Sequence, residues 1–256
     1  MKGSTGKISV LPFLAMALVP LVAAGAGLRP LSTDRPDITE SPYTVDAGHF
    51  QFETEIANWA RDGSERGYSL GELNSKVGLD SANDLQLVLP FYAHVHDGGE
   101  GFGDMEVRLK HNFWGNDEGS TALAIMPFIK LPTANGGLGN GEYEGGIIVP
   151  FGFDGPCDWS FGVQGEADLA ADDDGVYHVD FLTSATSSHP ISENAGFFLE
   201  LVSILGTDSS EDWEAYFNIG MTWAFAPMCQ LDGGIRTGLT QASADLIPFV
   251  GASTKF

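Results

Sequence analysis

The sequence is poor in basic residues, and it has few cysteines. Only 12 of its 256 residues are Lys or Arg, against 35 Asp or Glu, which gives a formal charge of −23. Without Lys2 and Lys7, which lie in the first 26 residues, 10 bases face 35 acids and the charge becomes about −25. A surface this acidic repels nucleic acid, so we expect no nucleic-acid partner.

Long apolar runs are missing after residue 26. No later stretch approaches the roughly 20 consecutive apolar residues that a membrane-spanning helix needs. This excludes a protein with several spanning helices, but not a β-barrel, in which apolar and polar residues alternate. Residues 1–26 differ, because two lysines precede an apolar stretch that ends in Ala24-Gly-Ala26. We interpret 1–26 as a cleaved secretory signal peptide, with an uncleaved anchor as the alternative.

The two cysteines, Cys157 and Cys229, both lie in short segments that contain proline and are typical of turns. A secreted chain enters an oxidising compartment, where they form a disulfide only if the two turns are neighbours. The sequence leaves both a disulfide and two free thiols open. It also lacks a phosphate-binding loop, a dinucleotide fingerprint and a zinc-knuckle pattern, so we expect no cofactor and no metal ion.

Apolar and polar residues alternate with a period of two in much of the sequence. The last ten residues divide into two faces, one with Val250, Ala252, Thr254 and Phe256 and the other with Gly251, Ser253 and Lys255. Such alternation predicts a β-strand with two different faces. A C-terminal strand that ends in an aromatic residue is typical of bacterial outer-membrane barrels. We therefore expect the barrel-assembly machinery to recognise this strand through Phe256.

The same alternation recurs upstream in long stretches. It begins at residue 48 and returns near 67–79, 84–94, 104–114, 120–131, 142–153, 158–169, 176–186, 195–205, 212–225, 230–240 and 247–256. Twelve strands of this length suit tilted crossings of a bilayer and exceed the usual length of strands in soluble sheets. We predict an all-β protein, an antiparallel transmembrane β-barrel of about 12 strands over 48–256, in the outer membrane among lipids and lipopolysaccharide. A soluble secreted β-sandwich is the alternative.

The breaks between the stretches differ in length. Those after even-numbered strands are mostly compact and rich in Pro, Gly and Asn, whereas those after odd-numbered strands, including 61–66, are on average longer or more acidic. Short periplasmic turns opposite longer external loops are expected for an outer-membrane barrel. The eighth break, around 188–191, is as long as several loops and weakens the trend.

Charged residues in the strands fall on the face opposite the dominant apolar set. A Lys or Arg on the lipid face would cost about 2–4 kcal/mol at mid-membrane, so we expect this face to line the lumen. The candidate lumen residues are Glu53, Glu55, Glu72, Lys76, Glu106, Arg108, Lys110, Lys130, Glu166, Asp180, Glu200, Glu214, Asp232 and Arg236. Two interpretations stay open: ion pairs that hold a narrow barrel shut, or a polar conduit for a solute.

Evidence for an enzyme is weak. Some outer-membrane barrels hydrolyse lipids with Ser, His and Asn, but none of the six histidines lies in a recognisable nucleophile motif. His94 and His96 have a spacing that suits a metal ion on a strand, yet an exposed loop explains them better. The acidic runs 172–174 and 208–212 are better explained as solvated loops than as cation sites. We expect no catalytic residues.

Three stretches resemble a known family. They are Ser32-Thr-Asp-Arg-Pro-Asp-Ile-Thr-Glu-Ser-Pro-Tyr43, Asp46-Ala-Gly-His-Phe-Gln-Phe-Glu53 and Gly101-Phe-Gly-Asp-Met-Glu-Val-Arg-Leu-Lys-His-Asn112. From about residue 32 to the C-terminus, the chain is similar to bacterial outer-membrane proteins described as transporters of the meta-pathway of phenol degradation. The resemblance implies a barrel that passes small, often aromatic or hydrophobic molecules. It does not name the solute.

The N-terminal segment 27–47 is too polar and too rich in proline to be a strand. We predict that it folds into the barrel as a plug, in which Asp34, Arg35 and Asp37 pair with lumen charges such as Glu106, Arg108 and Lys110. A disordered periplasmic tail is the alternative. A channel for small solutes is the function that we expect, and a structural or surface-interaction barrel without transport is the alternative.

Overall fold

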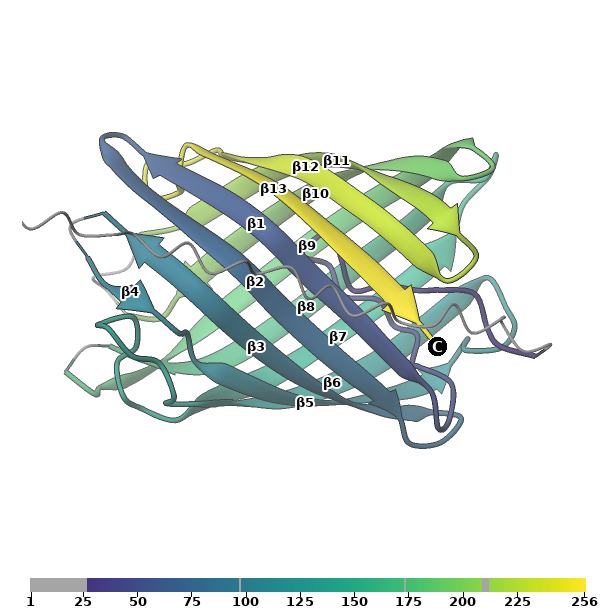
Figure 1. Ribbon diagram of the computed structural model, residues 1–256, viewed down its shortest axis with the longest axis horizontal. Coiled ribbons are helices and arrows are strands. Elements are labelled where there is room, and N and C mark those ends of the chain that lie inside the picture. The colour runs from purple at the N-terminus through teal and green to yellow at the C-terminus, as the bar shows by residue number, and fades with distance from the viewer. Residues whose placement is uncertain (1–26, 97, 173, 209–211) are drawn as a thin grey trace, which may run out of the picture.

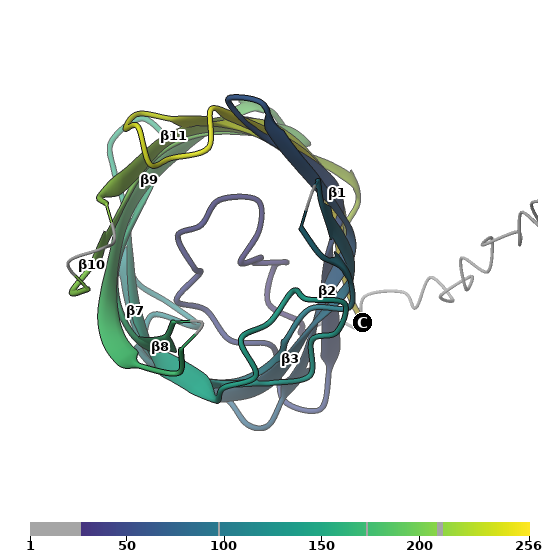
Figure 2. The same cartoon turned by 90° about the vertical axis from the view of Figure 1, so that its left-hand side faces the viewer.

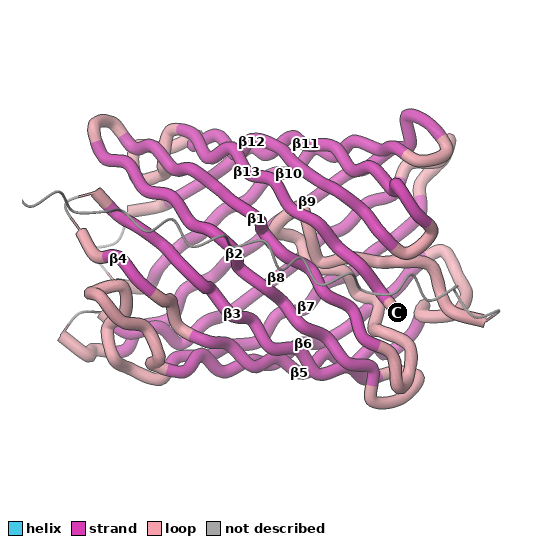
Figure 3. Tube along the Cα trace, in the orientation of Figure 1, coloured by secondary structure: helices cyan, strands magenta, loops and turns pink. Residues whose placement is uncertain are grey.

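A computed structural model describes residues 27–96, 98–172, 174–208 and 212–256, so the predicted signal peptide lies outside the described residues. The described chain contains no helix that is long and apolar enough to cross a membrane. It forms one closed antiparallel sheet (Figures 1 and 3). The strands are β1 (Phe50–Asp62), β2 (Glu65–Gly78), β3 (Asn83–Val95), β4 (Glu100–Gly101), β5 (Met105–Trp114), β6 (Thr121–Leu131), β7 (Glu144–Asp154), β8 (Ser160–Ala171), β9 (Tyr177–Ser192), β10 (Ala195–Gly206), β11 (Glu214–Ala226), β12 (Cys229–Gly238) and β13 (Leu246–Lys255).

The predicted barrel is confirmed. Twelve of the strands are long, and β4 is a two-residue strand that pairs only with β3. Each long strand pairs with its neighbours in sequence, and β13 closes the ring against β1. At this closure the backbones of Phe50 and Phe256 exchange two hydrogen bonds of 2.9 Å, so the last residue completes the ladder. A closed sheet has no free edge, which a strand-built membrane protein requires.

The two ends of the barrel differ as expected. The end with the C-terminus, called the turn end, carries the connections 79–82, 115–120, 155–159, 193–194 and 227–228. The opposite end, called the loop end, carries the connections that follow β1, β3, β6, β8, β10 and β12. In Figure 1 the turn end is on the right, where the C-terminus is marked.

Two predicted breaks have other bounds in the structure. Residues 188–191 lie inside β9, where Pro190 pairs with Gly196 of β10. Proline has no amide hydrogen to donate. Because β8 pairs with β9 only up to Ser188, no hydrogen bond between β8 and β9 is lost at Pro190. The predicted loop 61–66 is a two-residue turn, Gly63-Ser64, with Gly63 at φ 54°, a conformation that glycine adopts without strain.

The barrel is apolar outside and polar inside, as the alternation predicts. On β11, the side chains of Ile219, Met221, Trp223 and Phe225 are about half exposed, whereas Asn218, the neighbour of Ile219, is buried. The wall therefore presents its hydrophobic side chains to lipid. Rings of β7 and β8 stack in a row near the turn end, from Phe151 through Phe153 and Phe161 to Trp159, as in the aromatic belt of a membrane protein.

The lipid face gives a first testable prediction. Replacing Ile219, near the middle of β11, by Lys should lower the free energy of unfolding in lipid vesicles by about 2–4 kcal/mol. Phe225→Lys is the matched control, because it lies near the turn end of the same strand and should cost about 1 kcal/mol or less. Urea titration measures the free energy of unfolding of each variant. An equal loss in the two would contradict a position of Ile219 near the membrane centre and of Phe225 near its surface.

Candidate permeation path and its central segment

Residues 27–47, called the N-terminal segment, lie inside the barrel. Figure 2 looks in from the loop end and shows this segment as a purple loop within the ring of strands. It enters at the turn end, where Arg29 contacts Asp46 at 2.9 Å, and returns to the same end before β1. Its middle residues reach strands on opposite sides of the lumen, such as Glu53 of β1 and Glu200 of β10.

Asp34 is the most heavily bonded side chain of the segment. Its carboxylate forms salt bridges with Lys76 of β2 and, at 2.5 Å, with Lys110 of β5. The side chains of both lysines are at most 2% exposed. Two charges this deeply buried need a fixed counter-charge, because an unpaired ammonium group out of water is very costly. Lys76 also pairs with Glu53 of β1, whereas the counter-charge of Lys110 comes from the segment.

Glu200 of β10 holds the segment on the opposite wall. It accepts hydrogen bonds from the backbone amides of Ile38 and Thr39, at 3.0 and 2.7 Å, and from the Thr39 hydroxyl at 2.7 Å. Asn218 of β11 donates a further bond to it at 2.5 Å. Glu200 is 1% exposed, so each of its lone pairs must be satisfied within the protein.

The predicted ion pairs of the segment are partly correct. Asp34 does pair with Lys110, but Arg108 pairs with Glu40, at 2.6 Å, and with Glu106 rather than with Asp34 or Asp37. Arg35 lies 2.9 Å from Asp232 and 3.4 Å from Glu55, on the other side of the lumen. Asp37 has no Lys or Arg within 4.0 Å among the described residues, so its predicted pairing with a basic residue is wrong.

Wall side chains also bind the backbone of the segment. Donors include Gln51 to the Ser32 carbonyl at 2.7 Å and Asn112 to the Pro42 carbonyl at 2.8 Å. Lys255 of β13 donates to the carbonyls of Arg29 and Pro30 and forms a salt bridge with Asp46 at 3.1 Å. An extended chain without strand partners has unpaired amides and carbonyls, and here the wall satisfies many of them.

Glycine makes room for the segment at one close approach. A Cβ atom on Gly251 of β13 would lie 2.2 Å from a guanidinium nitrogen of Arg35. Any other residue at this position would therefore displace Arg35 from Asp232 and Glu55. Alternation in the sequence puts Gly251 on the same face as Lys255, but it does not reveal this contact.

The remaining candidate lumen residues lie mostly toward the loop end. Lys130 pairs with Glu144, Asp180 lies 3.4 Å from His178, and Glu214 accepts a hydrogen bond from the Tyr216 hydroxyl at 2.5 Å. Glu72, Glu166 and Arg236 line a cavity near the segment. The structure thus brings all fourteen candidates to the inner side of the wall, but only some of them contact the segment.

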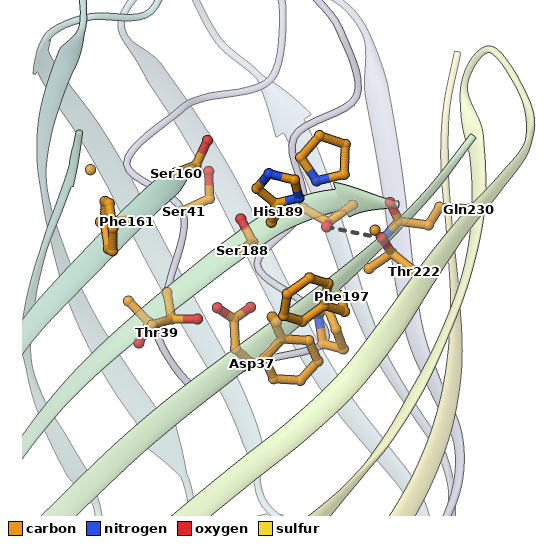
Figure 4. Close-up of a pocket in the computed structure, with 18 of the residues that line it drawn as sticks. Asp37, Thr39, Ser41, Ser160, Phe161, Ser188, His189, Phe197, Thr222 and Gln230 are labelled. Carbon is orange, nitrogen blue, oxygen red and sulfur yellow. Dashed lines mark hydrogen bonds between the residues drawn. The ribbon is translucent and has the colours of Figure 1, made fainter. Parts of the chain in front are cut away.

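Two cavities of the lumen border the middle of the segment. The inner cavity, of about 490 Å³ near the turn end, is bounded by the segment and by β7 to β12. Figure 4 shows side chains that line it, among them Thr39, Ser188 and Thr222. The outer cavity, of about 350 Å³, lies toward the loop end. Arg35, Pro36, Asp37 and Glu40 line both, so this part of the segment separates the two.

At the turn end, Asp46 stays ionised. Burial alone would raise the pKa of this carboxyl, but hydrogen bonds and charge from Arg29 and Lys255 outweigh burial and lower it. A lowered pKa means that the pairing stabilises the protein above the ordinary pKa of Asp and is lost as pH falls through the lowered value. The entry point of the segment is therefore fixed at neutral pH.

A family model described as "Putative MetA-pathway of phenol degradation" matches residues 33–256, which includes most of the segment and the whole barrel. The chain belongs to this family. It is called the phenol-degradation family below.

Solved outer-membrane proteins share the fold of this member of the phenol-degradation family. An outer membrane channel from Pseudomonas putida F1 superposes with a TM-score of 0.64 at 14% identity, covering 88% of this chain and 100% of the other. The NanC porin has a TM-score of 0.59 at 10% identity, over 81% of this chain and 100% of its own. The KdgM porin has a TM-score of 0.54 at 8% identity, over 81% and 99%. No curated protein matches the sequence. A closed barrel with an apolar outer face is the form in which strands cross the bacterial outer membrane, and short connections like those of the turn end are typical of its periplasmic side.

One motif was missed in the sequence. Gly67-Tyr-Ser-Leu-Gly71 has the Gly-x-Ser-x-Gly spacing of hydrolase nucleophiles. In this member of the phenol-degradation family it lies within β2, where Ser69 pairs with Asn58 and Ala93, and not at a strand-to-helix turn. At the loop end, the ring nitrogen of His94 lies 3.2 Å from a Glu100 carboxylate. Neither observation supports a catalytic serine.

The cysteines are both free. Cys157 is exposed in the turn between β7 and β8, and Cys229 begins β12. Both are at the turn end, as the sequence predicts. Of the acidic loops, Asp97, Asp173 and 209–211 lie outside the described residues. Within the described part of the chain, no cluster of three metal-binding side chains occurs.

Proposed function

We propose that this protein is a channel for small solutes in which the N-terminal segment sets the narrowest point. The observation that carries the proposal is the pair of cavities, about 490 and 350 Å³, that share Arg35, Pro36, Asp37 and Glu40 of the segment as lining. A solute that crosses the barrel passes these residues. The segment is bonded to the wall at its ends and its middle, so it narrows the lumen as a fixed part of the channel.

Deleting residues 29–45 tests this proposal. The mature chain and the deletion variant are refolded in detergent, checked for heat-modifiable migration on a gel, and inserted into planar bilayers. Because the narrowest point limits ion flow, the deletion should raise single-channel conductance roughly threefold or more. Unchanged conductance in a folded deletion variant would exclude the segment as the plug. A wild-type barrel that folds and does not conduct would favour the structural barrel without transport.

We propose small aromatic molecules with a polar substituent, such as phenol, as the solutes. The inner cavity offers the rings of Tyr43 and Phe198 together with hydroxyl groups such as that of Thr222. Ring stacking and a few polar contacts are the usual means of binding such a molecule. The family description points to the same class of compound.

Filling the inner cavity should weaken phenol binding. Thr222 of β11 faces the lumen and lines this cavity, so Thr222→Leu should reduce the block of channel current by phenol roughly threefold or more. Thr237→Leu is the matched control, because Thr237 pairs with the lipid-facing Phe217. The measurement is the phenol concentration that halves the current. Equal block of both variants would argue against phenol in this cavity.

A further inference from the structure

The part of the segment that separates the two cavities carries an excess of negative charge. Of its four residues that line both cavities, Asp37 and Glu40 are acidic and Arg35 is basic. The guanidinium of Arg35 is already paired with Asp232, at 2.9 Å, and with Glu55, at 3.4 Å. It therefore contributes no free positive charge to the boundary.

The two acids are less fully compensated. One carboxylate oxygen of Glu40 lies 2.6 Å from Arg108, while its other oxygen is buried without a hydrogen-bond partner among the described residues. Arg108 is also shared with Glu106. Asp37 forms no salt bridge within the described chain, and Figure 4 shows its carboxylate among the side chains that line the inner cavity. Asp37 is thus the acidic side chain at the boundary that no basic residue of the described chain pairs with.

The side chains that line the outer cavity are also mostly acidic. Seven carboxylates and three guanidinium groups line it. Asp34 and Glu53 are matched by the buried Lys76, and Asp34 also by Lys110. Among the described residues this leaves Glu72 and Glu166 without a basic partner within 4.0 Å, and only Arg236 of the lining without an acidic one. A solute that arrives from the loop end therefore meets an acidic approach before it reaches Asp37.

We infer that Asp37, supported by Glu40, makes this barrel a cation-selective channel that admits small cations and neutral molecules and rejects anions. Acidic groups at a narrow point select cations by attraction and repel anions, and the apolar wall around the lumen strengthens their field. The inference rests on the proposed channel function. It assigns a selectivity to the same path and agrees with neutral phenols as solutes, whereas aromatic carboxylates should be excluded.

The test is the reversal potential of the refolded mature chain in a planar bilayer with a tenfold KCl gradient. The wild type should prefer K⁺ over Cl⁻ roughly fivefold or more, and Asp37→Asn should reduce this ratio roughly threefold, because one charge near the path acts on both ions in opposite directions. Asp37→Glu keeps the charge and should keep the preference. Asp62→Asn, at the exposed tip of β1, is the matched control and should leave the ratio unchanged.

The outcomes separate the two proposals. A channel that conducts without cation preference, or in which Asp37→Asn keeps the wild-type ratio while it folds and conducts, overturns the inference and leaves the channel function intact. A folded wild type that does not conduct overturns both. Heat-modifiable migration of each variant shows whether the barrel has formed. A loss of preference in Asp37→Asn alone, restored by Asp37→Glu, supports the inference.

Discussion

Asp34→Ala should release the N-terminal segment from the wall and lower the free energy of unfolding by about 3–5 kcal/mol. The reason is that Lys76 and Lys110 would then be buried with less counter-charge, and removing one partner of a buried ion pair typically costs this much. Asp34→Asn keeps the shape but not the charge, so it should lose most of the same stability. Urea titration of the barrel in lipid vesicles measures the loss.

Release of the segment can be detected independently of stability. A Glu-specific protease should cleave after Glu40 in Asp34→Ala, whereas the bonded Glu40 of the wild type should resist it. Asp62→Ala, which removes an exposed carboxylate at the tip of β1, is the control and should behave as the wild type. Resistance of Glu40 in a folded Asp34→Ala variant would show that Asp34 does not hold the segment.

Glu200→Ala should have the second-largest effect, a loss of about 2–4 kcal/mol. The change leaves the amides of Ile38 and Thr39 and the side-chain amide of Asn218 without their acceptor, and each unsatisfied buried donor costs about 1–3 kcal/mol. Water that enters the vacated space offsets part of the loss. The measurement is again the free energy of unfolding in lipid vesicles.

The control for this change is Glu193→Ala, in the exposed turn between β9 and β10. It removes the same atoms near the end of the same strand and should cost less than about 0.5 kcal/mol. Glu200→Gln retains one acceptor oxygen and should fall between the two. A loss in Glu200→Ala no greater than that in Glu193→Ala would contradict the role of Glu200 as the anchor of the segment.

Much of the fold follows from the sequence because a membrane barrel enforces a period of two over every strand. A residue such as Lys110 can face only lumen or lipid, and the large penalty on the lipid side decides between them. The same rule gives the lumen face of Arg236 and Lys255. The sequence predicts a break at 188–191 because His189 and Pro190 are typical of a turn. In the structure these residues belong to β9, beyond its last pair with β8, and a proline is tolerated there because no hydrogen bond to β8 is lost.

The pairing of individual charges could not be predicted in the same way. Alternation gives the face of Arg108 but not which part of the segment passes in front of it, and a shift of a few residues exchanges Glu40 for Asp37 as its partner. Contacts such as that between Arg35 and Asp232, 197 residues apart, depend on the curvature of the closed wall. The cavities cannot be predicted from the sequence either, because their position and size depend on which side chains pair across the lumen.

The path of the N-terminal segment bears on how the protein is assembled. Its two ends, near Arg29 and Asp46, are fastened at the same mouth of the barrel, so the segment is a loop that dips into the lumen and comes back. Such a loop can enter the lumen from the turn end after β1 and β13 have paired. No part of the chain then has to pass through the whole length of a closed barrel. Closure of the barrel and docking of the segment can therefore be two separate steps.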